Sequence, residues 1–121
     1  MIMVSLDTSL LELLRGVRVD LARTRDPSTA SLARPRARLA WIASLIPPEC
    51  AHQRHLLDMA AQVAAEIGLG DADTAQDTTR LRAAVAAVNA VVESLANPAS
   101  HEGTRMMDDA RQELAGFGLP S

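Results

Sequence analysis

The sequence predicts an all-α fold, a compact antiparallel bundle of about five helices. Apolar residues recur at steps of three and four through most of the 121 residues, which is the period of an amphipathic helix. Prolines and glycines are few and fall between these periodic segments, as in a bundle with short connections. No stretch alternates with the period of two that a half-buried strand requires. The predicted helices cover roughly residues 5–25, 30–46, 48–67, 73–96 and 99–115.

The first two predicted helices end at prolines. The first stops before the Asp-Pro pair at 26 and 27, because the residue preceding a proline is pushed out of the helical region. The second ends at Pro47 and Pro48, and Pro35 either begins its regular part or kinks it. The residues predicted to face inward are Leu6, Leu10, Leu13, Leu14, Val17 and Leu21 in the first helix, and Leu32, Leu39, Ile42, Ala43 and Ile46 in the second.

The other three predicted helices have recognisable start and stop signals. The third opens with Pro48 in its first turn and is closed by Gly68 as a C-cap. The fourth begins at Asp73, where D-T-A-Q resembles a capping box, and ends before Asn97 and Pro98. The inward residues are Leu56, Ala60, Val63, Ala64 and Ile67 in the third, Leu81, Val85, Val88, Val92 and Leu95 as a heptad-like seam in the fourth, and Met107, Ala110 and Leu114 in the fifth.

Length and composition suit one domain over residues 1–121, with frayed termini at 1–4 and 116–121. Cys50 is the single cysteine, and the chain shows no secretory signal and no apolar window long enough for a bilayer, so we expect a cytoplasmic protein that contacts no membrane. All twelve basic residues are arginines, a usage typical of GC-rich bacterial genomes. The net charge of −3 and the two aromatic residues, Trp41 and Phe117, make nucleic acid an improbable partner.

Two faces are candidate protein interfaces. The fourth helix carries a stripe of small residues opposite its seam, which is either a subunit interface or the back of a central helix covered on both sides; the stripe comprises Ala83, Ala87, Ala90 and Ser94. In the second helix, Trp41 and Leu45 lie outside the inward stripe. They form either an interaction hot spot or the second buried side of a helix packed between two others.

One basic cluster precedes these residues in the second helix. Arg34, Arg36 and Arg38 could receive phosphates, an acidic partner or the acidic second half of this chain, although most such clusters are a solvated face.

The segment PECAHQRHLLDM, residues 48–59, holds the strongest candidates for chemistry. Glu49, His52, His55 and Asp58 follow one another at steps of three, close enough in pairs to share an ion. Each step turns about 60° around a helix, so the four cannot bind one metal together. Glu49, His52 and His55 are weak metal candidates, because a di-iron site needs a second Glu-x-x-His and a zinc site needs further ligands. We therefore expect no metal or cofactor, with His52 at the core edge hydrogen-bonded to Glu49, and His55 exposed.

These observations favour a non-enzymatic interaction module that self-associates, as a homodimer, adaptor or regulatory subunit. No catalytic residue is expected, since the sequence contains no glycine-rich phosphate loop and no Gly-x-Ser-x-Gly. One alternative is a His-centred site that binds metal or accepts a phosphoryl group as a histidine phosphotransfer domain does; the Lys and Gly that normally follow such a histidine are absent after His52. Another alternative is docking of nucleic acid or phosphate on the arginine cluster.

Overall fold

Helices make up the regular structure of the part of the chain that the computed structural model describes, residues 2–24, 29–67, 74–97 and 99–117. Side chains are described for residues 10–24, 31–67, 76–97 and 99–117. The elements are α1 (Ile2–Arg23), α2 (Thr29–Leu45), the 3-10 helix η1 (Pro48–Cys50), α3 (Ala51–Glu66), α4 (Thr74–Ala96) and α5 (His101–Ala115). No strand occurs in these ranges. The predicted all-α bundle of about five helices is therefore confirmed.

Helix boundaries differ from the predicted ones mainly at two places. α1 already begins at Ile2, three residues before the predicted start, and neither proline nor glycine precedes Ser5. The third predicted helix is divided, since the backbone leaves helical geometry at Cys50, with φ −104° and ψ 44°, between η1 and α3. The expected C-cap at Gly68 and the capping box at Asp73 lie outside the described residues.

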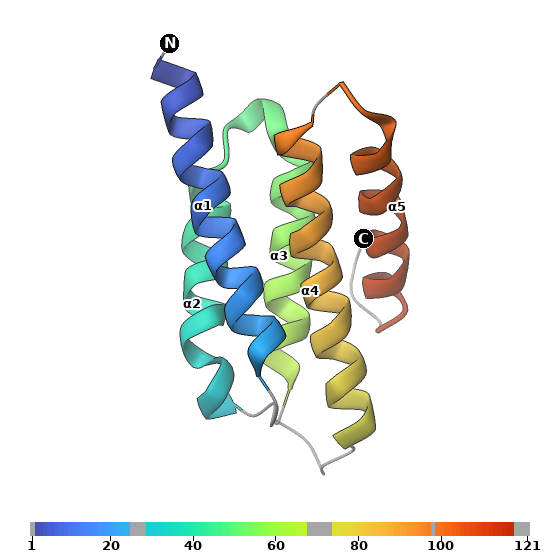
Figure 1. The fold of residues 1–121 in the computed structure, drawn as a ribbon. Helices are drawn as coiled ribbons and strands as arrows, with labels where there is room; N and C mark the ends of the chain where they lie inside the picture. Colours follow the sequence, from blue (N-terminus) through green and yellow to red (C-terminus); the bar gives the residue numbers. More distant parts are fainter. Residues whose placement is uncertain (1, 25–28, 68–73, 98, 118–121) are drawn as a thin grey trace.

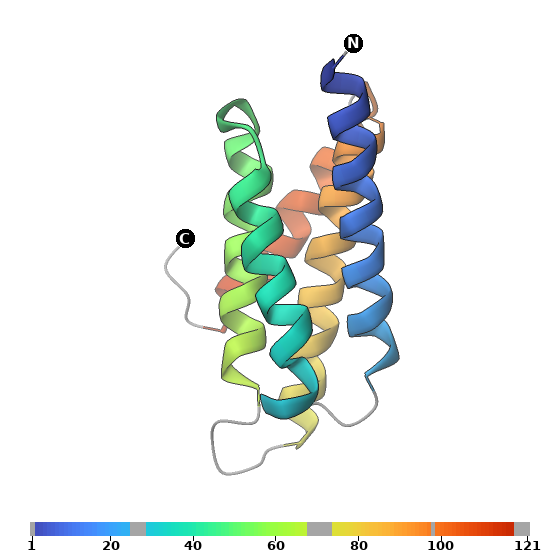
Figure 2. The same cartoon turned by 90° about the vertical axis from the view of Figure 1, so that its left-hand side faces the viewer.

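Four helices form a ring and the fifth packs on its outside. α1 contacts α2, α2 contacts α3, α3 contacts α4, and α4 contacts α1, so each of the four has two neighbours in the ring. α5 lies along α4 on the side away from α1 and also touches α3, as Figures 1 and 2 show. α3 and α4 therefore each contact three of the other α-helices, whereas α1, α2 and α5 each contact two.

The predicted inward residues form one continuous core. The inward residues predicted for the second and third helices are all buried, as are Leu10, Leu14, Val17 and Leu21 of α1. The side chain of Leu6 lies outside the described residues. Leu57 and Met59 are also buried, although their positions in the sequence did not predict it. Four of the residues predicted to face inward are half-buried at the edge of this core, Leu13, Val85, Leu95 and Met107. Within the described ranges, none of the helices combines the length and the apolar character needed to cross a membrane.

α4 and α5 approach one another closely where Gly103 meets Ser94. A β-carbon added to Gly103 would lie 2.6 Å from the Ser94 Cα and 2.8 Å from its backbone nitrogen. Gly103 is buried, and the two backbones are in direct contact there. The absence of a side chain at Gly103 therefore sets the distance between α4 and α5 at this end.

Polar side chains connect helices at the outside of the core. Arg38 Nη1 donates to Asp20 Oδ2 at 2.8 Å, between α2 and α1. Arg18 Nη1 donates to Asn89 Oδ1 at 2.7 Å, between α1 and α4. Asn89, a polar residue beside the valine seam, thus fixes the position of α4 along α1.

Candidate functional site

The histidine-containing segment does not have the geometry of one continuous helix. Glu49 belongs to η1 and is exposed, whereas His52 and His55 belong to α3 and are also exposed. The expectation that His52 lies at the core edge beside Glu49 is therefore wrong, since both are exposed and the backbone leaves helical geometry at Cys50 between them. The prediction that His55 is exposed is confirmed.

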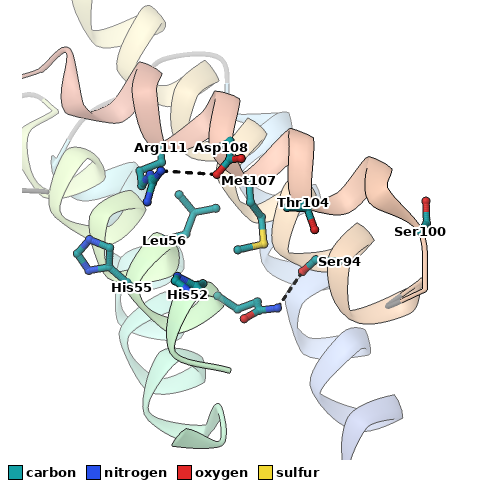
Figure 3. Close-up of a pocket in the computed structure, with 10 residues that line it drawn as sticks. His52, His55, Leu56, Ser94, Ser100, Thr104, Met107, Asp108 and Arg111 are labelled. Carbon is teal, nitrogen blue, oxygen red and sulfur yellow. Dashed lines mark hydrogen bonds and ion pairs between the residues drawn. The ribbon is translucent and has the colours of Figure 1, made fainter. Parts of the chain in front are cut away.

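His52 and His55 line a cavity of about 440 Å³ between α3 and α5. Figure 3 shows Leu56 and Met107 near its middle, with His55 and Arg111 toward one end and Ser94 and Thr104 toward the other. The residues that line it are His52, Gln53, His55 and Leu56 of α3, Ser94 of α4, Ser100 before α5, and Thr104, Met107, Asp108 and Arg111 of α5. Ser100 is also the N-cap of α5, where its side chain accepts a hydrogen bond from the amide of Glu102.

The polar side chains around this cavity are mostly hydrogen-bond donors, which suits a ligand that accepts hydrogen bonds. Arg111 Nη2 lies 3.6 Å from Asp108 Oδ1, and both side chains are at least half exposed. Gln53 Nε2 donates to Ser94 Oγ at 3.5 Å and joins α3 to α4 at the floor of the cavity. Asp108 is the only carboxylate among the lining residues, and it already has a cationic neighbour.

The residues present do not fit a metal ion. Over the residues whose side chains are described, no group of three His, Cys, Asp or Glu side chains comes close enough to hold one. Glu49 turns away with η1, and Asp108 lies across the cavity on the other helix without forming such a group with His52 and His55. Within the described part of one chain, Glu49, His52 and His55 therefore do not form a set of metal ligands.

Trp41 and Leu45 form the most exposed apolar pair in the described side chains. Trp41 is 53% exposed and Leu45 is 42% exposed, one turn apart on α2. α2 is therefore not packed between two helices on that side, as the alternative interpretation of these residues required. The geometry leaves the pair free for contact with another molecule.

The stripe of small residues on α4 is internal. Ala83, Ala87 and Ala90 are fully buried within the single chain. They lie on the face of α4 that also carries Arg80 and Ser94. Ser94 contacts Gly103 of α5, and Arg80 Cζ lies 5.7 Å from the centroid of the Phe117 ring, just after α5. Of the two interpretations of these alanines, their burial favours a central helix that is covered on both sides over a subunit interface. Ser94 is partly exposed where it lines the cavity.

The arginine cluster of α2 is not one continuous basic surface. Arg34 and Arg36 are two residues apart, which places them on nearly opposite sides of a helix. Arg38 is paired with Asp20. One of the three cations is thus paired within this chain, and the other two point in different directions.

The sequence did not identify four of the polar residues in the cavity, Gln53, Thr104, Asp108 and Arg111. The positions on α5 carry a signal, since Ser100, Thr104, Met107 and Arg111 repeat at steps of four, three and four and therefore share one face. The pairing of this face with the start of α3 depends on the tertiary packing, which no local pattern reports.

Comparison of this chain with models of known protein families, with curated proteins and with solved structures finds no match.

Proposed function

We propose that the protein is a non-enzymatic interaction module that pairs weakly with a second copy of itself through the outer face of α2. The observation that carries the proposal is the exposure of Trp41 and Leu45, at 53% and 42%. Among the described side chains, Val19 on α1, at 38%, is the one other exposed large hydrophobic residue. Exposed tryptophan and leucine on a rigid helix are typical of the centre of a protein contact.

A symmetric pairing suits this face. In a two-fold dimer the same patch must match itself, which two antiparallel copies of α2 achieve if the axis passes between Trp41 and Leu45. Each Trp41 then packs on Leu45 of the second copy. Arg34, which belongs to the same helical stripe, lies at the edge of this contact, where its charge stays hydrated.

The contact is small, so the pairing is expected to be weak and reversible. Two apolar side chains per copy fall short of the roughly 800 Å² per partner that standard stable interfaces bury. A small interface of this kind suits an adaptor or regulatory subunit, which must exchange one partner for another. A cytoplasmic location is part of the proposal, since the single cysteine requires no oxidising compartment.

Sedimentation equilibrium and tryptophan fluorescence test the proposal together. Trp41 is the only tryptophan, so its emission reports this face alone. Across the micromolar range the mean mass should rise toward that of a dimer, and the emission maximum should shift to shorter wavelength as Trp41 leaves water. The variant Leu45→Ser keeps the fluorophore and should abolish both changes.

Val19→Ser is the matched control, because it removes an exposed aliphatic side chain of similar exposure from another helix. It should leave both the mass and the emission shift unchanged. A wild-type protein that stays monomeric at high concentration with a constant emission maximum would rule out self-association.

The arginine-docking alternative has less support, because Arg38 is already paired and Arg34 and Arg36 diverge. It predicts nucleic-acid binding that weakens steeply with salt.

A further inference from the structure

The cavity between α3 and α5 is independent of the α2 face and has its own chemical character. Its volume of about 440 Å³ falls within the range of small-molecule sites, roughly 300 to 1,000 Å³. Three different elements supply the side chains around it, and the helices α4 and α5 that frame one end are fixed by the contact of Gly103 with Ser94. The rigid frame makes it a preformed site.

Hydrogen-bond donors dominate the polar lining. His52 and His55 each offer a ring N–H, Gln53 offers an amide, and Arg111 offers the planar guanidinium fork that matches a carboxylate or phosphate. The hydroxyl of Thr104 can donate from the opposite end, whereas the single proton of Ser94 Oγ is already donated to the Val91 carbonyl at 2.9 Å. Asp108 supplies the one carboxylate in the lining, and this group would repel an anion.

Two apolar side chains separate the donor groups at the two ends. Leu56 is 2% exposed and Met107 is half-buried, and Figure 3 places both near the middle of the cavity. Of these two side chains Met107 has the accessible apolar surface, and a fully hydrated inorganic ion would leave it without an apolar partner. A ligand with both an anionic group and an apolar body satisfies the whole lining.

The geometry points to a binding site for a small amphipathic organic anion, a carboxylate or phosphate monoester with a short apolar chain. The anionic group lies beside Arg111 and His55 from opposite helices, and the apolar chain covers Leu56 and Met107. Each helix contributes one polar and one apolar contact to such a ligand, His55 and Leu56 from α3 and Arg111 and Met107 from α5.

Titration of isotope-labelled protein with four defined probes, followed by amide NMR shifts, tests this site. Hexanoate and hexyl phosphate represent the two possible anionic groups, hexanol lacks the charge, and acetate lacks the apolar chain. Hexanoate, hexyl phosphate or both should shift amides of residues 52–56 and 104–111. Hexanol should bind about tenfold more weakly, the factor expected for one charged hydrogen bond. Acetate should bind at least about tenfold more weakly because it lacks the methylene groups that contact the apolar lining.

Two pairs of variants should change the affinity for the anions in opposite directions. Arg111→Gln should weaken binding of the anions about tenfold and leave hexanol binding unchanged, whereas Arg105→Gln, an exposed arginine of α5 outside the cavity lining, should have no effect. Asp108→Asn should strengthen anion binding because it removes the one repelling carboxylate. Its neighbour Asp109 is exposed and outside the lining, so Asp109→Asn is the control.

Several results would overturn the inference. One is hexanol binding as tightly as hexanoate, and another is shifts that fall mainly outside α3 and α5. A third is an equal effect of Arg111→Gln and Arg105→Gln, which would show a general charge effect rather than a site. Absence of shifts with both anions at millimolar concentration would also reject it.

Discussion

Gly103 and Gly16 are both helical glycines, yet their surroundings are opposite. A β-carbon at Gly103 would overlap the backbone of Ser94, with contacts of 2.6 and 2.8 Å. At Gly16 the nearest atom would be Arg38 Nη2 at 3.8 Å, an ordinary contact with a flexible side chain. Helix propensity favours alanine over glycine by roughly 1 kcal/mol at either site. Packing therefore decides the sign of each substitution.

Gly103→Ala is expected to lower the free energy of unfolding by about 1–3 kcal/mol, because the new methyl group forces α5 away from α4. Gly16→Ala is expected to raise it by up to about 1 kcal/mol. Urea denaturation followed by circular dichroism measures both. Equal stabilisation by the two substitutions would mean that α5 is not held against Ser94 in solution.

At the scale of one element, α4 shows how a helix with small side chains becomes the centre of a bundle. Its alanines are buried toward α5, and its valines and leucines point toward the ring formed with α1 and α3. Because alanine adds little beyond the backbone, neighbouring helices can approach on both sides. The amino-acid composition of α4 thus explains its three neighbours.

Ala87→Arg tests this central position. Ala87 is fully buried, so the guanidinium would have to displace α5 or remain unpaired in the core. We expect the free energy of unfolding to fall by more than about 3 kcal/mol, with loss of a cooperative transition if the folded state is no longer stable. The measurement is thermal and urea denaturation monitored at the helical circular dichroism signal.

Ala22→Arg introduces the same side chain at an exposed alanine of α1 and serves as the control. It should change the free energy of unfolding by less than about 0.5 kcal/mol. If Ala87→Arg were equally harmless, the small-residue face of α4 would be open, and the subunit-interface interpretation would be restored.

The helices were predictable from the sequence because each depends on a local pattern. Periodic leucines in α1 and α2, and prolines after them, predicted both the elements and their inward faces. The partner of a given face was not predictable, since a helical wheel gives a direction and not a neighbour. The alanine stripe therefore allowed two interpretations until α5 was seen to cover it.

The candidate sites likewise differ in whether a local sequence pattern could predict them. Trp41 and Leu45 were recognisable because both fall outside the inward stripe of one helix. The cavity joins residues 52–56 to residues 100–111, which only tertiary packing brings together. Glu49 was assigned wrongly because a single non-helical residue, Cys50, changed its direction, and the sequence around Cys50 contains no breaker after Pro48.

At the scale of the whole molecule, the arrangement of helices predicts unequal local stability. α4 contacts α1, α3 and α5, and α3 contacts α2, α4 and α5, whereas α5 has neighbours on one side only and α1 extends to Ile2 at one end of the bundle (Figure 1). Opening a peripheral helix breaks fewer contacts than opening the central one. Amide protection should therefore follow the number of neighbouring helices.

Hydrogen exchange followed by mass spectrometry measures this directly. Amides in the middle of α4, around residues 83–92, and of α3, around residues 56–64, should exchange slowest and only through global unfolding, because neither helix can open without exposing the core to more than one neighbour. α5 should exchange faster through a local opening that leaves the four-helix ring intact. Gly103→Ala should accelerate exchange in α5 more than in α1, since its clash lies between α4 and α5. Equal protection of α4 and α5 would instead show that the five helices unfold as one unit, with α5 integral to the ring rather than packed on its outside.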